Sequence, residues 1–456
     1  MNHVMSYREV LDNCKMNRFH WYVVLLAGLG GFADFYNISG VIAGGSLSIE
    51  SGFGVGTSSY ALMVALTNVV MLVGALGYGL LGDKFGRRWL FTVDLLSMLV
   101  FSVISYFAST FTEFVVLRLL VALAIGGDYP AVLPLVTEFS PKKDRGKLLL
   151  IFWVITNMGE LVGYFVAWYF VLNIGANLAM ERIMILTGFI PIILGIVLRT
   201  KAPDSPRWLY RKRKFKDLQE AVRKASGVTI SIEDLQIERD SVKEKKEDIL
   251  PEGFSKRHAI YMALLIVVPL FLVAEGVGIG VYYYPTLFRS LHVSKVNSIL
   301  YEAILFSPFI PITILAAYVT DKIGRANTVL AGIIPSIIGF VLIIFFHTVD
   351  DLLVIILLLI SWMGLSEEPL ISLASEIFPT FLRSFATGIQ TSAWRMGFLA
   401  TSFILPPLLL LAGISGMYLV ESILFTAAGC IVMFLLKPTG RIARKSLEEI
   451  TRELGK

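Results

Sequence analysis

The sequence predicts an all-α integral membrane protein whose twelve transmembrane helices form two pseudo-symmetric six-helix bundles. Its 456 residues are 56% hydrophobic and only 16% charged, whereas soluble domains average about 45–50% apolar and about 25% charged residues. The apolar residues also occur in runs of roughly 20, the length that crosses a bilayer. A set of polar residues recurs at one fixed offset in the two halves, as expected of a duplicated bundle.

Twelve apolar runs follow one another when the chain is read in windows of about 19 residues. They lie near 20–44, 58–81, 89–108, 113–135, 147–172, 180–199, 259–288, 296–319, 327–346, 352–375, 384–412 and 414–436. We therefore expect a first bundle over 1–199, a linker over 200–258, a second bundle over 259–436 and a tail over 437–456.

Most Lys and Arg residues lie in alternate gaps between these runs, around 83–88, 142–147, 201–256 and 321–325, and in both tails. The positive-inside rule assigns such gaps to the cytoplasm. The sequence thus predicts a multi-pass plasma-membrane protein with both termini and the linker in the cytoplasm. The formal net charge of +5 follows from this topology and gives no reason to expect a nucleic-acid partner.

The linker is the only long hydrophilic stretch between the runs. Apolar spacing over 215–222 indicates a short amphipathic helix on the cytoplasmic surface. The charged run 237–248 indicates a solvated helix or a disordered segment. We therefore expect the linker to tether the two bundles.

An internal repeat appears when residues in the cytoplasmic gaps are compared between the halves. Seven pairs share one separation of 238 positions, which is improbable by chance and indicates two homologous bundles of the kind that alternating-access transporters use. The pairs are Asp83 and Asp321, Lys84 and Lys322, Gly86 and Gly324, Arg87 and Arg325, Glu138 and Glu376, Pro141 and Pro379, and Arg145 and Arg383.

Several classes of protein are disfavoured by what the sequence lacks. Its two cysteines, Cys14 and Cys430, form no disulfide framework and no thiolate metal site. The sequence has no phosphate-binding loop of the Gly-x-x-x-x-Gly-Lys-Ser/Thr type, so a primary pump is disfavoured. We expect a protein that is not an enzyme and that has no cofactor or metal beyond a proton as coupling ion.

The motif Gly79-x-Leu81-x-Asp83-x-x-Gly86-Arg87-Arg88 resembles the loop signature of the major facilitator superfamily. The resemblance spans essentially the whole chain and implies an alternating-access carrier of small solutes, which we expect to act as a monomer in the bilayer. Three further motifs resemble signatures of the sugar-porter-like branch, which also holds phosphate, aromatic-acid and organic-ion carriers: Glu138-Phe-Ser-Pro141, Glu376-Ile-Phe-Pro379 and Pro203-Asp204-Ser205-Pro206-Arg207.

Charged residues at the cytoplasmic helix ends are candidates for a gate. Carboxylates and guanidinium groups can pair across neighbouring helices while that side is closed and separate when it opens. Exposed pairs are worth only about 0–1 kcal/mol each, which suits a two-state switch. The alternative is that they only anchor the topology. The set comprises Asp83, Arg87, Arg88, Glu138, Arg145, Asp321, Arg325, Glu376 and Arg383.

Charged residues inside the apolar runs are the strongest functional signal, because each costs roughly 2.5–3.5 kcal/mol on insertion scales and persists mostly where it faces a cavity. Five of them fall near the middle of their runs and suggest a single site. A sixth polar residue, three positions after Asp34, should share its helical face and cavity wall. The candidates are Asp34, Asn37, Asp128, Glu160, Glu275 and Arg395.

Proton coupling should depend on a carboxylate, because all five histidines lie in tails or loops. Asp34 is the first candidate and Asp128 the second, with Glu160 and Glu275 also open. Each could instead be a structural ion-pair partner. Arg395 is expected to anchor an anion, or else to form a salt bridge with Glu275 or Glu160.

The substrate remains the least determined property. Gly126-Gly127-Asp128-Tyr129-Pro130 resembles the helix 4 signature of phosphate:proton symporters, and Asp34 matches the first Asp of their Asp-x-x-Asp pair, although Asn37 replaces the second. The resemblance and Arg395 together favour symport of a small anion, either phosphate or an organic or aromatic acid.

A sugar is the alternative substrate, because Tyr283-Tyr284-Pro285-Thr286-Leu287-Phe288 also resembles the sugar porters. Trp153 stands where those porters carry a sugar-binding amide, which counts against it. An organic cation, a passive facilitator and a non-transporting sensor remain further alternatives.

Overall fold

The computed structural model describes residues 6–199, 203–243, 293–343, 364–378 and 382–433, together with positions 267, 268, 345, 445 and 449. Every regular element within these residues is helical. The predicted all-α membrane fold is confirmed. Seven helical segments of the described part are long and apolar enough to cross a membrane.

The first bundle forms where the first six apolar runs were expected, with ends that differ by a few residues. Two of its helices have 29 residues and one has 30, which at about 1.5 Å per residue exceeds the roughly 30 Å of the hydrocarbon core. The elements are α2 (Arg18–Phe35), the π-helix η1 (Tyr36–Gly44), α3 (Ser46–Phe53), α4 (Thr57–Phe85), α5 (Arg87–Tyr106), α6 (Phe111–Phe139), α7 (Arg145–Ile174) and α8 (Leu178–Arg199).

The second bundle shows one departure from the continuous runs of the sequence. The run 296–319 is interrupted at Ser307 and Pro308, since proline has no N–H to continue the helix. The last two predicted runs, 384–412 and 414–436, are two helices that meet at Gly413, where φ is 66°, and the label α18 covers both. The predicted helix 259–288, which contains Glu275, lies outside the described residues. The elements are α13 (Lys295–Phe306), α14 (Phe309–Ile323), α15 (Arg325–Ile343), α17 (Glu367–Ile377) and α18 (Arg383–Ile431).

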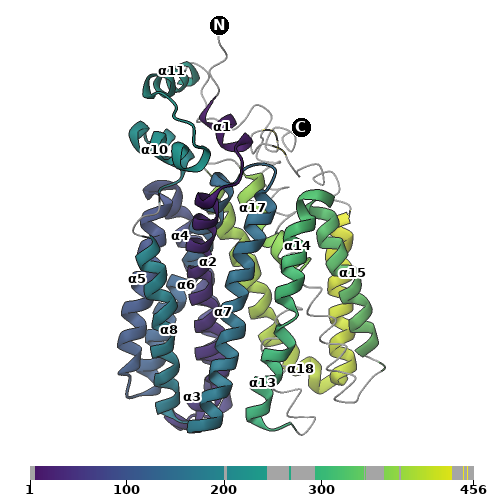
Figure 1. Ribbon diagram of the computed structural model, residues 1–456. Coiled ribbons are helices and arrows are strands. Elements are labelled where there is room, and N and C mark those ends of the chain that lie inside the picture. The colour runs from purple at the N-terminus through teal and green to yellow at the C-terminus, as the bar shows by residue number, and fades with distance from the viewer. Residues whose placement is uncertain are drawn as a thin grey trace.

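Four short helices gather at one end of the bundles, which we call the linker face (Figure 1). Leu218, Ala221, Val222 and Ala225 are the buried residues of α10, and their spacing gives the helix one apolar side. The predicted amphipathic stretch 215–222 is therefore a helix that packs with its apolar side buried. The elements are α1 (Tyr7–Asn13), α9 (Pro206–Arg211), α10 (Phe215–Ser226) and α11 (Ile232–Lys243).

The two bundles meet along α4 with α18 and along α7 with α14. Thr137 and Ser375, which are 238 positions apart, share a hydrogen bond of 2.7 Å between their hydroxyl oxygens. A residue can touch its own repeat mate only near the pseudo-twofold axis. The contact therefore places this axis between the ends of α6 and α17, as the repeat predicted.

Candidate functional site

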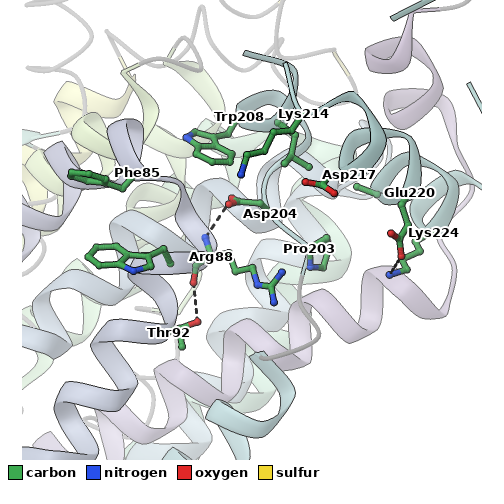
Figure 2. Close-up of a pocket in the computed structure, with 13 residues that line it drawn as sticks. Phe85, Arg88, Thr92, Pro203, Asp204, Trp208, Lys214, Asp217, Glu220 and Lys224 are labelled. Carbon is green, nitrogen blue, oxygen red and sulfur yellow. Dashed lines mark hydrogen bonds and ion pairs between the residues drawn. The ribbon is translucent and has the colours of Figure 1, made fainter. Parts of the chain in front are cut away.

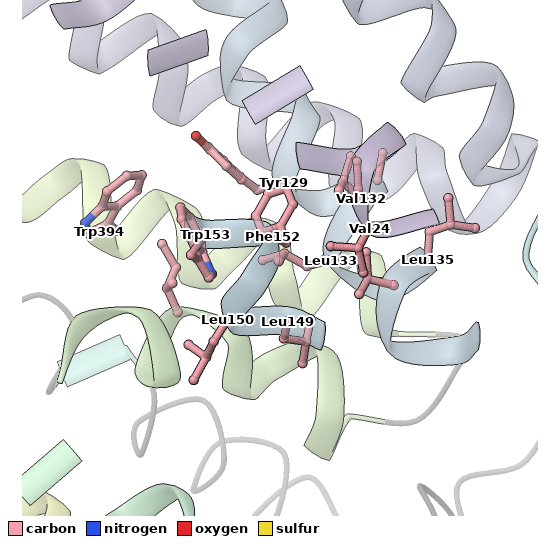
Figure 3. Packing of buried hydrophobic residues seen from close by; sticks show 14 of the residues in the cluster. Val24, Tyr129, Val132, Leu133, Leu135, Leu149, Leu150, Phe152, Trp153 and Trp394 are labelled. Atoms are coloured by element: carbon pink, nitrogen blue, oxygen red, sulfur yellow. The ribbon is translucent and has the colours of Figure 1, made fainter. Parts of the chain in front are cut away.

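A cavity of about 40 Å³ lies between the two bundles. Ligand sites usually measure about 300–1,000 Å³, so this conformation encloses room for water rather than for a solute. Figure 3 shows two of its lining residues, Trp153 and Trp394. The described residues that line it are Phe35, Trp153, Asn157, Glu160, Phe306, Phe309, Glu367, Glu368, Ile371, Trp394 and Phe398.

The first bundle presents one face of α7 to the cavity, because Trp153, Asn157 and Glu160 are spaced by four and three residues. All three side chains are buried. The Glu160 carboxylate accepts a hydrogen bond of 2.9 Å from the Ser39 hydroxyl of η1. Trp153 Nε1 donates to the Ser372 hydroxyl at 3.0 Å across the bundle interface.

The second bundle contributes two adjacent carboxylates from the first turn of α17. Glu368 accepts hydrogen bonds from Asn157 Nδ2 at 2.5 Å and from Thr313 Oγ1 at 2.8 Å. Glu367 accepts one from Trp394 Nε1 at 2.5 Å. The Glu368 donors come from α7 and α14, so this carboxylate connects the two halves at the cavity, whereas the Glu367 donor lies in α18 of the same half.

Aromatic rings form the remaining cavity wall. Tyr129 and Trp153 stack with ring centroids 5.3 Å apart, and Trp394 meets Trp153 edge-on at 6.2 Å. Phe35 stacks on Trp394 at 6.2 Å. Such rings offer flat apolar faces beside the hydrogen-bonding carboxylates. The described lining therefore combines apolar ring faces with hydrogen-bonding groups.

Asp34 does not line this cavity. It is fully buried, and both of its carboxylate oxygens lack a hydrogen-bond partner within the described part of the chain. Gly30, one turn earlier on α2, lies so close that an added Cβ would be 2.0 Å from Arg199 Nη2 and 3.1 Å from Asp128 Oδ2. Asp34 therefore sits beside a charge cluster inside the first bundle.

The charge cluster joins three helices. Arg199 pairs with Asp94 at 2.8 Å and with Asp128 at 2.9 Å, and all three side chains are buried. Sequence reasoning identified Asp128 but missed Arg199, which stands at the end of the sixth apolar run. Two acidic residues in apolar runs need a buried cation as partner, and this requirement could have pointed to Arg199.

Asn37 is held away from the cavity by a second buried cation. It accepts a hydrogen bond of 2.8 Å from Arg118 Nη2 and donates one of 2.9 Å to the Ala33 carbonyl. The prediction that Asp34 and Asn37 share a cavity wall is therefore wrong in this conformation. The reason is local, because η1 begins at Tyr36 and its wider turn changes the angle between positions 34 and 37.

Arg395 is buried behind Trp394, with its guanidinium carbon 4.2 Å from the ring centroid. Its Nε and Nη2 atoms have no hydrogen-bond partner among the described residues. Arg395 does not line the cavity. Of the five charged candidates for one site, the structure brings Glu160 to the cavity and Asp34 with Asp128 to the charge cluster.

Most of the predicted gate residues converge at the linker face. Glu138 pairs with Arg87 at 2.5 Å and with Arg383 of the other bundle at 2.7 Å, and it also accepts a hydrogen bond from Ser205. These side chains are buried, whereas exposed pairs were expected. Breaking a buried pair costs about 3–5 kcal/mol, far more than an exposed one.

The repeat-related pair in the second bundle is bidentate. Arg325 donates from Nε at 2.9 Å and from Nη2 at 2.6 Å to Glu376, and from Nη1 at 2.7 Å to Asp321. Asp321 in turn accepts hydrogen bonds from the backbone N–H groups of Gly146 and Lys147 at the start of α7. An acidic group at a helix N-terminus is favourable, so this contact also joins the two bundles.

The other three gate candidates behave differently. Arg145 pairs with Asp12 of α1 at 2.6 Å. The Arg88 side chain lines a separate cavity of about 540 Å³ beside Trp208 and Lys214 of the linker (Figure 2). The Asp83 side chain lies outside the described part of the structure.

Asp204 ties the linker to the first bundle next to that second cavity. Its Oδ1 accepts hydrogen bonds from the Arg87 N–H at 3.2 Å and the Arg88 N–H at 3.4 Å. Burial raises the pKa of the Asp204 carboxyl, against the opposing effect of these N–H donors. Figure 2 shows Asp204 between Arg88 and Trp208, so the linker motif caps the start of α5.

The chain matches the family model "Sugar (and other) transporter" over residues 23–454, and it belongs to that family. It is therefore a secondary transporter of the major facilitator superfamily and not an enzyme. It is 26% identical to the glucose transporter GlcP of Staphylococcus epidermidis, with 96% of this chain and 98% of that protein covered. Identity to the niacin transporter NiaP of Acinetobacter baylyi is 25%, with 96% and 98% covered.

A third relative is the arabinose-proton symporter of Bacillus subtilis, 24% identical with 85% of this chain and 88% of that protein covered. Among solved structures, the proton:xylose symporter XylE bound to 6-bromo-6-deoxy-D-glucose superposes with a TM-score of 0.79 at 21% identity, covering 95% of this chain and 99% of that chain. The comparisons support the sugar-porter family. They do not support the narrower resemblance to phosphate symporters and aromatic-acid carriers.

Proposed function

We propose that this protein is a proton-coupled symporter for a sugar or related polyol. The observation that carries the proposal is the chemistry of the cavity: Trp153 and Trp394 provide ring faces, while Asn157, Glu160 and Glu368 provide hydrogen-bonding groups. No Lys or Arg is among its described lining residues. A neutral polyol needs no such cation, because amides and carboxylates hydrogen-bond its hydroxyls.

The anion expected from Arg395 fits this cavity poorly. An anion would approach Glu160, Glu367 and Glu368, and like charges at close range in a low dielectric repel strongly. Arg395 could offset this only if it turned toward the cavity. We therefore place the sugar first and keep the anion as an outcome of the substrate test.

An organic cation is the competing occupant, because carboxylates and aromatic faces also suit an ammonium group. The family matches favour the sugar, since GlcP, the arabinose symporter and XylE are all named for sugars. The pH dependence of affinity separates the two. Cation binding should strengthen as the cavity carboxylates ionise, whereas binding of a neutral sugar should follow the coupling proton.

Asp34 is the proposed proton carrier. Its buried carboxylate has no hydrogen-bond donor among the described residues, and it interacts electrostatically with Asp128, Arg199 and Arg395. Protonating Asp34 would change the balance of this cluster, which is how a proton can bias two conformations. Glu160 and Asp128 are the secondary candidates.

We further propose that the linker face is cytoplasmic and that its ion pairs form the cytoplasmic gate. Glu138 and Asp321 hold the halves together there through Arg383 and the start of α7. The described structure therefore corresponds to a state closed to the cytoplasm. Separation of these contacts would open that side, as alternating access requires.

Counterflow in proteoliposomes tests the substrate class. Vesicles loaded with glucose, xylose, arabinose, inositol, nicotinate, phosphate or choline are diluted into trace labelled solute of the same kind. We expect transient accumulation with at least one sugar or polyol. Counterflow only with nicotinate or phosphate would show that the substrate is an anion. Counterflow only with choline would favour an organic cation as substrate. Binding of a solute without flux would favour a sensor.

A further inference from the structure

The linker-face gate follows the internal repeat in two of the three contacts that can be compared among the described residues. In one contact, Arg383 crosses to Glu138. In the second, its neighbour Ser384 accepts a hydrogen bond of 3.3 Å from Arg87 Nε. Glu138 and Arg87 also pair with each other within the first bundle. One half of the gate is thus a cluster of Glu138, Arg87, Arg383 and Ser384 in which Glu138 pairs with both arginines.

The repeat mates Glu376, Arg325, Arg145 and Gly146 should form an equivalent cluster around Glu376. Gly146, the mate of Ser384, lies against Arg325, since an added Cβ would be 2.6 Å from the guanidinium carbon. Arg325 pairs with Glu376. The backbone next to Arg145 therefore stands within one side-chain length of Glu376. The crossing from Arg145 to Glu376 is the contact that the repeat predicts.

Arg145 makes a different contact. Its Nη2 pairs with Asp12 Oδ1 at 2.6 Å, and its Nη1 donates to the Lys445 carbonyl at 3.1 Å. Glu376 uses both carboxylate oxygens on Arg325 instead. Arg145 is the repeat mate of Arg383, which joins the two halves. The Arg145 guanidinium is instead held by Asp12 of α1.

Helix α1 is built to keep Asp12 in this place. A capping box of Ser6 and Glu9 starts the helix, and the Tyr7 ring lies 4.8 Å from that of Tyr210 in α9. The Lys142 N–H donates to the Asp12 carbonyl at 3.1 Å. Both Tyr7 and Asp12 are buried. The ion pair is therefore positioned by several independent contacts.

We propose that α1 is a latch that competes with Glu376 for Arg145, with Asp12 as its positioning residue. The proposal rests on the proposed function of the linker-face ion pairs as a gate. While Asp12 holds Arg145, the pair of Arg383 with Glu138 is the guanidinium–carboxylate pair that joins the halves among the described gate residues, and the gate opens more readily. When α1 releases Arg145, a second crossing to Glu376 forms and favours the closed state.

Distances across the linker face test the latch in the full chain. Spin labels replace Lys84 and Lys322, exposed repeat mates in the two halves, in a Cys14→Ser/Cys430→Ser background in nanodiscs. Asp12→Asn should raise the ratio of the short-distance to the long-distance population severalfold, because Arg145 is freed for Glu376. The same Asp12→Asn change in an Arg145→Met background should leave the ratio unchanged, because no guanidinium remains there to reach Glu376.

The dependence on Arg145 distinguishes competition from mere anchoring of α1. If Asp12→Asn leaves the ratio unchanged, or raises it equally in the Arg145→Met background, the latch is refuted. Tyr7→Ala loosens α1 without altering the ion-pair groups and should act like Asp12→Asn, which covers the case in which that variant does not fold. Asp144→Asn neutralises a neighbouring carboxylate that caps no N–H group, and it should leave the ratio unchanged.

The outcome is separable from the proposed function. The distances are measured without substrate, so a protein that carries no sugar still reports whether Asp12 and Glu376 compete. Conversely, sugar flux with unshifted distances in the Asp12 and Tyr7 variants would keep the transporter and remove the latch.

Discussion

Glu368 is the side chain on which the cavity depends most. It accepts hydrogen bonds from Asn157 of the first bundle and Thr313 of the second. The two donors belong to different halves, so Glu368 can keep both hydrogen bonds only while the halves stay close together. A sugar hydroxyl could replace either donor when the halves move apart, which would connect binding to the conformational change.

Replacing Glu368 by Gln should raise the KM for the transported sugar by about 10–100-fold, since a hydrogen bond to a charged group contributes about 1.5–3 kcal/mol. Initial rates of uptake over a range of sugar concentrations measure this. Glu113→Gln is the matched control, because it replaces a carboxylate in the first turn of α6, away from the cavity. A KM within twofold of the unmodified protein would remove Glu368 from the site.

Asp34→Asn should retain sugar exchange and lose accumulation. The amide keeps the shape of the side chain but cannot exchange a proton with either side of the membrane. Equilibrium exchange and gradient-driven uptake are measured on the same vesicles. Full accumulation in this variant would show that another carboxylate, with Asp128 or Glu160 as next choice, carries the proton.

At the scale of elements, the approach of η1 to α7 depends on two glycines. A Cβ added to Gly40 would lie 2.8 Å from the Gly163 Cα, and the reverse contact is equally close. The backbones can approach this far only without side chains, as in other membrane helix pairs. This contact sets Ser39 against Glu160 at the cavity.

Gly163→Val should therefore destabilise the protein by about 1–3 kcal/mol, the usual cost of overpacking, and should lower the midpoint of thermal unfolding in detergent. Gly77→Ala is the control, because an added Cβ there meets nothing within 4 Å. An equal effect of both substitutions would show that helix propensity, rather than the close approach, sets the stability.

The docking of α1 gives Cys14 a distinct pH dependence. Burial, with the nearby Asp12 charge as the second cause, raises the pKa of the Cys14 thiol to about 11, whereas a free thiol has a pKa of about 8.5. Only the thiolate is alkylated, so the thiolate fraction should keep rising about tenfold per pH unit from pH 7 to 9.5.

The rate of maleimide labelling in a Cys430→Ser background measures this rise. In sodium dodecyl sulfate the same thiol should begin to level off near its ordinary pKa, which provides the reference. A plateau at about pH 8.5 in the folded protein would mean that α1 does not bury Cys14.

At the scale of the whole molecule, the sequence predicted the architecture well because hydropathy and the repeat are properties of the chain itself. Runs of apolar residues determine where helices cross. The 238-residue offset found in seven other pairs also separates Thr137 from Ser375, which meet in the structure. The assignments 1–199, 200–258, 259–436 and 437–456 remain a prediction, as do the cytoplasmic termini.

The candidate site was less predictable, for physical reasons. A charged residue in an apolar run must face protein or water, but its position alone does not say which, so Asp34 and Glu160 were expected together although they lie in different places. The pairing of Arg199 with Asp94 depends on how α5 and α8 meet. The contact of Arg145 with Asp12 could not be foreseen, because the short helix α1 gives no membrane signal.

Proton-driven uptake tests the central claim most directly. Proteoliposomes with an imposed inward proton gradient are given a labelled sugar that was positive in counterflow. The account predicts accumulation above the external concentration, which collapses when a protonophore is added. Entry of the sugar only to equilibrium, at a rate that does not depend on the gradient, would contradict proton symport and identify a facilitator.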